Sequence, residues 1–280
     1  MFTRPDQTYD ATDIDLDRLL SDAASPITRI CRLIGENKKV LDIGAGNGIL
    51  GQAIRTLHPS ITIDGLEPNG YAASIAKPYY RNFYQGYFAD HVSDILKQQY
   101  DYMILADVIE HIADPVAFLH EIVKCLPAQG KLILSIPNVA HGSNRIALMN
   151  GHFDYSDSGL LERTHLRFFT YHTIQQIVKT IDLHTEVIQY LQRSILLTDQ
   201  LTRHCSIGLI PYLKMKSDPY ARVYQFILVL SRSTCETKEE TYGMNTGWVC
   251  DYFHRVRELR VRLTSYVRGN HKTEGIKKHT

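Results

Sequence analysis

The sequence predicts an α/β fold in which helices cover both faces of a mainly parallel, doubly wound sheet. Short apolar segments alternate with amphipathic ones between Ala24 and Ser231, glycines follow the first apolar segment, and an acidic residue ends the second. Parallel strands need a crossover connection, usually a helix, so this alternation is typical of βαβ units. Seven apolar segments predict a seven-stranded sheet.

Five strands are expected before the rhythm changes, at residues 40–43, 61–66, 83–88, 102–105 and 131–136. The fourth is fully apolar, as a strand covered on both faces should be. Helices are expected at residues 24–34, 49–57, 72–76 and 116–126. Asp114 is a suitable N-cap for the last of these because Pro115 follows at the first helical position.

The pattern changes at Pro137. Residues 137–171 are rich in His, Asn, Gly, Tyr and Arg and are expected to form an insertion after the fifth strand. A helix at 173–181 and strands at 185–191 and 220–231 follow. Beyond Ser231 we expect a polar linker and then a basic helix. The chain is therefore divided into a domain of residues 1–231, which includes the insertion, and a basic helical extension of residues 232–280.

The composition excludes several classes of protein. The chain has 280 residues and a formal net charge of +1, which gives no overall attraction to nucleic acid. Its five cysteines are scattered without a CxxC pair, which argues against a disulfide framework or a zinc site. No signal peptide or transmembrane segment is apparent, so a cytoplasmic protein that binds no nucleic acid is expected.

The strongest motif is VLDIGAGNGILG, residues 40–51. A strand delivers Asp42, and Gly44, Gly46 and Gly48 turn the chain tightly into a helix, where side chains would keep a ligand from the backbone. Glu67 ends the second strand, where a carboxylate can accept both hydroxyls of a ribose. The spacing of glycine loop and acid predicts a nucleotide-binding site.

Two classes of ligand compete for this site. Glycines 46, 48 and 51 formally match GxGxxG, which suggests a dinucleotide. Asp42, however, would repel a pyrophosphate, whereas it favours a cationic sulfonium ligand that carries an α-amino group. The predicted cofactor is S-adenosylmethionine.

Taken together, the motifs resemble class I S-adenosylmethionine-dependent methyltransferases (EC 2.1.1.-), whose fold is Rossmann-like. The likeness covers about residues 8–231, and its motifs are VLDIGAGNG, GLEP (65–68), FAD (88–90), YDYMILADVIEHIADP (100–115) and LPAQGKLILSIPN (126–138). The fourth-strand motif lacks the (D/N)PP(Y/F) sequence of DNA amino-methyltransferases. That difference counts against methylation of the amino groups of bases.

The resemblance also implies roles for single residues. Asp42 and the loop of Gly44, Ala45, Gly46 and Gly48 would lie near the methionine moiety. Glu67, with Pro68, would lie at the ribose, and Asp90 near the adenine amino group. Ala106 and Asp107 would lie beside the cofactor.

A bacterial subgroup associated with surface glycan and glycosyltransferase pathways is the most similar. The likeness to it consists of YD…DLD (9–17), PNVAH (137–141), LLERTHLRFFT (160–170) and PYARVYQFIL (219–228). O-methylation of a sugar in glycan or nucleotide-sugar metabolism is therefore expected. The alternatives are a methyltransferase for a small metabolite or lipid, and a non-catalytic cofactor-binding scaffold.

Three histidines are candidates for a general base at the carboxyl edge of the sheet. A sugar hydroxyl needs such a base to remove its proton. His111 follows the fourth strand, His141 follows the fifth, and His165 lies in the insertion. His111 could equally pack at a helix start. No cluster of residues has the spacing of metal ligands, so no metal site is expected.

Substrate contacts are expected from Asn138, Tyr155, Arg163 and Arg167. The two arginines can hold a phosphate or carboxylate, or can pair with nearby acids such as Asp157. The basic extension can dock on its own domain or on a sister chain as a homo-oligomer. It can also bind a membrane surface or a glycan-assembly partner peripherally.

Overall fold

The computed structural model describes residues 15–195, 207–215 and 217–243. These residues form two compact units. The first unit contains residues 15–140, 155–192 and 223–243, and the second contains residues 141–154 and the described part of 193–222. The basic helix that the sequence predicts in the extension lies outside the described residues.

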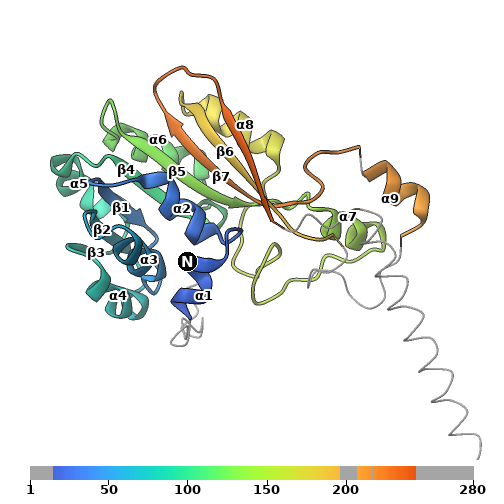
Figure 1. Ribbon diagram of the computed structural model, residues 1–280, viewed down its shortest axis with the longest axis horizontal. Helices are drawn as coiled ribbons and strands as arrows, with labels where there is room; N and C mark the ends of the chain where they lie inside the picture. The colour runs from blue at the N-terminus through green and yellow to red at the C-terminus, as the bar shows by residue number, and fades with distance from the viewer. Residues whose placement is uncertain (1–14, 196–206, 216, 244–280) are drawn as a thin grey trace, which may run out of the picture. The chain divides into compact units, whose positions relative to one another are not determined.

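The first unit is built on one mixed, mostly parallel sheet with the strand order β3-β2-β1-β4-β5-β7-β6-β8 (Figure 1). Only β7 runs antiparallel to its neighbours, β5 and β6. The α/β fold is confirmed. The strands are β1 (Lys39–Ile43), β2 (Thr62–Glu67), β3 (Phe83–Gln85), β4 (Tyr102–Ala106), β5 (Lys131–Pro137), β6 (His184–Gln192), β7 (Val223–Ser231) and β8 (Lys238–Gly243).

Helices connect the parallel strands, as the alternation predicts. In α6 the Asp114 side chain accepts a hydrogen bond from the Ala117 amide, and Pro115 is the first helical residue, so the expected cap is confirmed. The helices of the first unit are α1 (Leu16–Ser21), α2 (Pro26–Ile34), α3 (Ile49–Leu57), α4 (Gly70–Ala76), α5 (Val92–Gln98), α6 (Pro115–Cys125) and α8 (Tyr171–Thr180).

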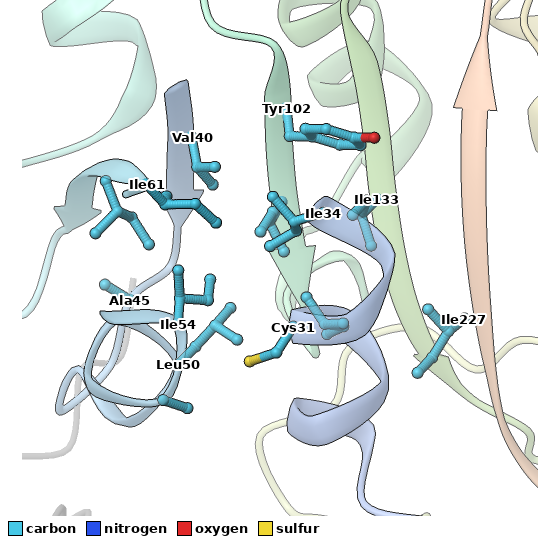
Figure 2. Close-up of a cluster of buried hydrophobic side chains, with 14 of the residues drawn as sticks. Cys31, Ile34, Val40, Ala45, Leu50, Ile54, Ile61, Tyr102, Ile133 and Ile227 are labelled. Atoms are coloured by element: carbon cyan, nitrogen blue, oxygen red, sulfur yellow. The ribbon is translucent and has the colours of Figure 1, made fainter. Parts of the chain in front are cut away.

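The core of the first unit lies between the sheet and helices α2 and α3. Figure 2 shows Cys31 and Ile34 of α2 beside strand residues. This cluster is fully apolar, and its residues are almost completely buried; burial of this kind contributes about 25 cal/mol per Å² of apolar surface. Its members include Ile30, Cys31, Ile34, Val40, Leu50, Ile54, Ile63, Ile104, Ile133, Ile227 and Val229.

The third strand is shorter than expected. The sequence predicts a strand over residues 83–88, but β3 ends at Gln85 because Gly86 adopts a positive φ of 135° and a 3-10 turn follows at Phe88–His91. Phe88 is buried, so its apolar character, which suggested a strand, comes from packing under this turn.

The eighth strand replaces part of the expected linker. Residues 234–243 have no apolar alternation, so the sequence predicts a polar linker there. This prediction is wrong for Lys238–Gly243, because these residues pair in parallel with β6. The sheet thus has eight strands and extends past residue 231. Charged side chains are common on edge strands because they discourage pairing with other chains, and that is why this strand looks like a linker in the sequence.

A polar network ties β8 to the rest of the first unit. Glu240 accepts a hydrogen bond of 2.7 Å from the Gln189 side chain of β6 and lies 3.4 Å from the Arg29 guanidinium of α2. Arg29 also stacks on the Tyr242 ring, 3.5 Å from its centroid. The edge strand is held by side chains as well as by its backbone.

The second unit contains α7 (Gly142–Met149) and α9 (Leu209–Met215). Its apolar cluster comprises Ile146, Ala147, Ile195, Tyr212, Met215 and Ala221. The segment expected as a single insertion, residues 137–171, is therefore divided: residues 141–154 belong to the second unit and residues 155–171 to the first. In the described residues no helix has the length and apolar character needed to cross a membrane.

Substituting Glu240 should change the pH dependence of stability. Hydrogen bonds from Lys238, and then from Tyr242 and Gln189, hold the pKa of Glu240 at about 2, below its ordinary 4.5. A lowered pKa in the folded state stabilises the protein above pH 4.5, and this contribution is lost as the pH falls toward 2. Glu240→Gln should cost roughly 1 kcal/mol at pH 7 and less in acid, as measured by urea unfolding.

Glu239→Gln is the matched control, because Glu239 is the exposed neighbour of Glu240 on the same strand. This variant should unfold like the wild type at every pH. An equal loss of stability in both variants would contradict a specific role of the network.

Candidate functional site

The glycine loop lies between β1 and α3. The amides of Gly44 and Ala45 both donate to the Leu66 carbonyl at the end of β2, at 2.8 and 3.0 Å. Gly44 and Gly48 have φ angles of 79° and 87°, which favour glycine. A Cβ on Gly44 would lie 2.6 Å from the Val108 side chain. The loop therefore needs glycine both for its backbone and because the turn after β4 packs against it.

Gly46 differs from these two glycines. It also has a positive φ, 54°, but a Cβ placed there would meet no atom within 4 Å. Its amide donates to Glu67 Oε2 at 2.9 Å, while Glu67 Oε1 accepts from the Asn69 amide at 2.8 Å. The loop and the acid of β2, which the sequence places far apart, thus meet at the carboxyl edge of the sheet.

Two buried acids lie at this edge. Asp42 accepts a hydrogen bond of 2.6 Å from the Tyr80 hydroxyl. Burial and the nearby charge of Glu67 raise the pKa of Asp42 to about 7. Burial likewise raises the pKa of Glu67. Both carboxyls would be stabilised in the charged form by a cationic ligand or by further hydrogen-bond donors.

Pro68 and Asp90 are exposed at the same end of neighbouring strands. Pro68 follows β2 directly. Asp90 lies in the 3-10 turn after β3 and accepts a hydrogen bond of 3.0 Å from the Tyr87 amide. Its carboxylate therefore fixes the local turn.

The end of β4 carries Ala106 and Asp107. Asp107 has an unusual φ of 55°, and its carboxylate accepts a hydrogen bond of 2.7 Å from the Gln225 side chain of β7. Although the residue as a whole is exposed, the surrounding protein and the charge of Glu162 raise the pKa of Asp107. A left-handed conformation at a residue other than glycine is a form of local strain that recurs at functional sites.

Glu110, His111 and His165 converge just beyond this turn; we call them the acid–histidine cluster. One potential ligand atom from each side chain lies within 4.8 Å of the others. The two imidazole rings are 4.9 Å apart and meet edge to face at 75°. Backbone amides of Leu166 and Arg167 donate to the Glu110 carbonyl at 2.8 and 3.0 Å, which holds the two segments together.

The carboxyl of Glu110 has an unusual environment. The residue is 1% exposed, and neither carboxylate oxygen has a hydrogen-bond partner among the residues that the structure describes. Burial, and secondly the charge of Asp107, raise the pKa of Glu110 well above its ordinary range. An unpartnered buried carboxyl is costly, so it indicates a ligand or a functional constraint.

The other residues expected to contact substrate are not all available for it. Asn138 is fully buried; its amide nitrogen donates to the Val223 carbonyl, and its oxygen accepts from the Ala140 amide. Arg163 forms an ion pair of 2.9 Å with Asp157, the alternative that the sequence left open. Arg167 donates twice to the Ala113 carbonyl. Tyr155 is 49% exposed.

His141 belongs to the second unit and is completely buried. Its Nδ1 lies 2.8 Å from the Ser143 hydroxyl and accepts from the Ser143 amide, and its Nε2 lies 3.4 Å from the Arg193 carbonyl. Burial lowers the pKa of His141 to about 4. Both ring nitrogens are engaged, which favours a structural role as the N-cap of α7.

Sequence reasoning missed Tyr80, Val108 and Glu110. Tyr80 lies in an unremarkable aromatic stretch, and only the fold brings its hydroxyl to Asp42. Glu110 directly precedes His111 in the fourth-strand motif, so the sequence could have indicated that it lies near a candidate histidine. The sequence could not have indicated that it lies near His165, because many residues separate the two.

The comparisons with known proteins identify a family and support the fold. A family model described as a methyltransferase domain matches residues 16–187. Two ubiquinone biosynthesis O-methyltransferases are similar: that of Klebsiella pneumoniae is 28% identical over 36% of this chain and 43% of its own length, and that of Xanthomonas axonopodis is 25% identical over 44% and 52%. The chain thus spans about half the length of these relatives, or less.

Solved structures support the fold. An S-adenosylmethionine-dependent methyltransferase from Archaeoglobus fulgidus has a TM-score of 0.50 at 15% identity, with 74% of this chain and 91% of that chain covered. One from Thermotoga maritima has a TM-score of 0.50 at 15% identity, with 77% and 92% covered. Because the matched model spans more than half of the residues, from the first helices to the sixth strand, the chain belongs to the methyltransferase domain family.

Proposed function

We propose that the protein is an O-methyltransferase that acts on the hydroxyl group of a small molecule. The observation that carries this proposal is the position of the acid–histidine cluster. It follows directly on the turn whose Val108 packs against Gly44 of the glycine loop. Groups able to act on a hydroxyl therefore adjoin the loop that holds the methyl donor.

The chemistry of methyl transfer explains why this position matters. The reaction is an in-line displacement at a sulfonium methyl, so the enzyme must align the acceptor and deal with its proton. A hydroxyl keeps its proton near neutral pH and needs help to lose it. Ligands of open α/β sheets bind at the carboxyl ends of the strands, where β1, β2 and β4 deliver these residues.

In this proposal Asp42 and the loop of Gly44, Ala45, Gly46 and Gly48 hold the methionine part of the cofactor, with Ala106 and Asp107 beside it. The carboxylate of Glu67 exchanges its bonds with the Gly46 and Asn69 amides for the ribose hydroxyls. Pro68 and Asp90 face the adenosine. The raised pKa of Asp42 is an argument for a cationic ligand there, since an α-ammonium group restores the charged form.

The identity of the acceptor is the finer part of the proposal. A sugar in glycan or nucleotide-sugar metabolism was expected from the sequence, and the exposed Tyr155 beside Phe168 would suit a sugar face. The ubiquinone biosynthesis relatives favour the alternative, a small metabolite or lipid acceptor. A scaffold without catalysis is the third possibility. The turnover assay described below tests it, because a scaffold would methylate none of the acceptors.

Glu67→Ala should weaken the binding of S-adenosylmethionine. Loss of a buried carboxylate that accepts hydrogen bonds from the ligand costs about 1–3 kcal/mol, or roughly 5- to 150-fold in Kd, as measured by calorimetry. Glu121→Ala is the control, because Glu121 is exposed on α6 and pairs only with Lys124. Equal affinities of wild type and Glu67→Ala, or tighter binding of NAD than of S-adenosylmethionine, would contradict the assigned site.

His111→Ala and His165→Ala should each keep cofactor affinity but lose on the order of 100-fold in turnover of a hydroxyl acceptor. Acceptors are screened first as sugars, nucleotide sugars and phenols, with S-adenosylhomocysteine as the product measured. The control is His172→Ala, since His172 is exposed on α8. If both cluster variants turn over like the control, the cluster has no part in the reaction. Exclusive methylation of an amine would contradict O-methylation.

A further inference from the structure

The acid–histidine cluster has the chemical composition of a metal site. Two imidazoles and one carboxylate place one potential ligand atom each within 4.8 Å of the others. Two histidines with a glutamate are also the protein ligands of a common type of catalytic zinc site, which leaves at least one position open. His165 comes from a distant part of the chain, so no spacing in the sequence could indicate the site.

The hydrogen bonds of the two histidines prepare them for this role. His111 Nδ1 lies 3.2 Å from the Thr164 carbonyl, and His165 Nδ1 lies 3.2 Å from the Leu160 carbonyl. A carbonyl only accepts, and the Thr164 hydroxyl, 3.1 Å from His111 Nδ1, donates its proton to Glu162. Each ring therefore carries a proton on Nδ1, and Nε2 is the nitrogen left to bind a ligand. Neither Nε2 is hydrogen-bonded to another described residue. Histidines that bind metals are usually oriented in this way, by a carbonyl on the other nitrogen.

The environment of the third side chain, Glu110, is the strongest independent evidence for a metal site. Glu110 is only 1% exposed, and one of its carboxylate oxygens is a potential ligand atom of the cluster. Neither oxygen has a hydrogen-bond partner among the described residues. Buried carboxylates in proteins are paired, hydrogen-bonded or bound to a metal. Among the described residues Glu110 is neither paired nor hydrogen-bonded, so its carboxyl is either neutral or completed by a ligand, and the two imidazoles beside it favour a metal ion as that ligand.

The surrounding charge also favours a cation. Asp107 and Glu162 are close enough to act on Glu110 electrostatically. Among the described residues none of the three carboxylates forms an ion pair with a lysine or arginine. Three acids thus gather around two imidazoles, and a divalent cation between them would stabilise the charged form of these carboxyls.

The geometry points to a binding site for a divalent transition-metal cation, of which Zn²⁺ is the type, held by Glu110, His111 and His165. Two nitrogen ligands select zinc and its neighbours over Mg²⁺ and Ca²⁺, which prefer oxygen. Metal–ligand bonds of about 2.0–2.2 Å require the three side chains to close in slightly on the cation.

The cation gives the cluster a defined task, which rests on the proposed O-methylation. The acceptor's hydroxyl oxygen takes the open position, where the metal lowers its pKa and its proton leaves to solvent. An electron pair of that oxygen then forms the new bond to the methyl carbon. The bond from this carbon to sulfur breaks, and sulfur keeps the pair as a neutral thioether. The histidines act as ligands and not as proton acceptors.

The test uses the metal alone. The full chain is purified, treated with a chelator and dialysed against ZnCl₂, and bound zinc is measured by elemental analysis. Co²⁺ is the spectroscopic probe, because its visible absorption reports nitrogen and oxygen ligation. Wild type and the control His172→Ala should each bind one more zinc ion per chain than His165→Ala or Glu110→Gln. The two cluster variants should bind it about 100-fold more weakly or worse.

A second measurement guards against misfolding. Zinc should raise the Tm of the wild type and of His172→Ala but not that of the cluster variants, since only a ligand that prefers the folded state stabilises it. Binding of S-adenosylmethionine by the variants shows that they are folded. Any zinc held by cysteines cancels in the difference between wild type and variants. Equal zinc content and equal Tm shifts in wild type and cluster variants would overturn the metal site.

The result is separable from the test of the proposed function. A chain that binds zinc at the cluster but methylates no hydroxyl keeps the metal site and contradicts O-methylation. A chain that methylates a hydroxyl at full rate after complete removal of metal overturns the catalytic task of the cation and leaves the O-methyltransferase proposal standing.

Discussion

The close approach of Val108 to Gly44 is the constraint on which the rest of the site depends. Since a side chain on Gly44 would collide with Val108, the turn after β4 and the loop after β1 can pack against each other only because one of them is bare backbone. The two amides that follow β1 are fixed in turn by the Leu66 carbonyl of β2. Three adjacent strands are thereby locked into one register at their carboxyl ends, where ligands of such sheets bind.

Buried acidic residues are a second feature of the carboxyl edge of the sheet. Asp42 and Glu110 lie in protein surroundings that penalise their charge, and each stands beside another acid that adds to the penalty. A stable protein tolerates such groups where a ligand completes them. Asp42 has one hydrogen bond, from Tyr80, whereas Glu110 has none in the described residues. The two sites thus differ in how much they depend on what binds.

Most of the sheet could be predicted from the sequence because its strands are apolar and its first turn is rich in glycine. The helix after the glycine loop was expected at residues 49–57 and is Ile49–Leu57. The charged edge strand Lys238–Gly243 could not be predicted, since its stability comes from partners such as Arg29 and Gln189 that are far away in the sequence. Local pattern reports burial, and this strand is mostly exposed.

The site shows the same limit. The glycine loop could be predicted because its residues form one contiguous motif. The acceptor side could not be resolved, because Glu110, His111 and His165 meet through backbone hydrogen bonds that no residue pattern records. A histidine that follows a strand is equally compatible with an N-cap, as His141 is, and with a ligand. Only the partners of its two nitrogens tell these roles apart.

Residues 165–167 are held to the turn after β4 by their backbone, and this affects which substitutions the protein can tolerate there. Leu166 and Arg167 hold the Glu110 carbonyl with their backbone amides, and the Leu166 side chain is 56% exposed. An attachment made by the main chain survives replacement of the side chains around it. The side chains beside the cluster can therefore vary while the cluster itself stays in place.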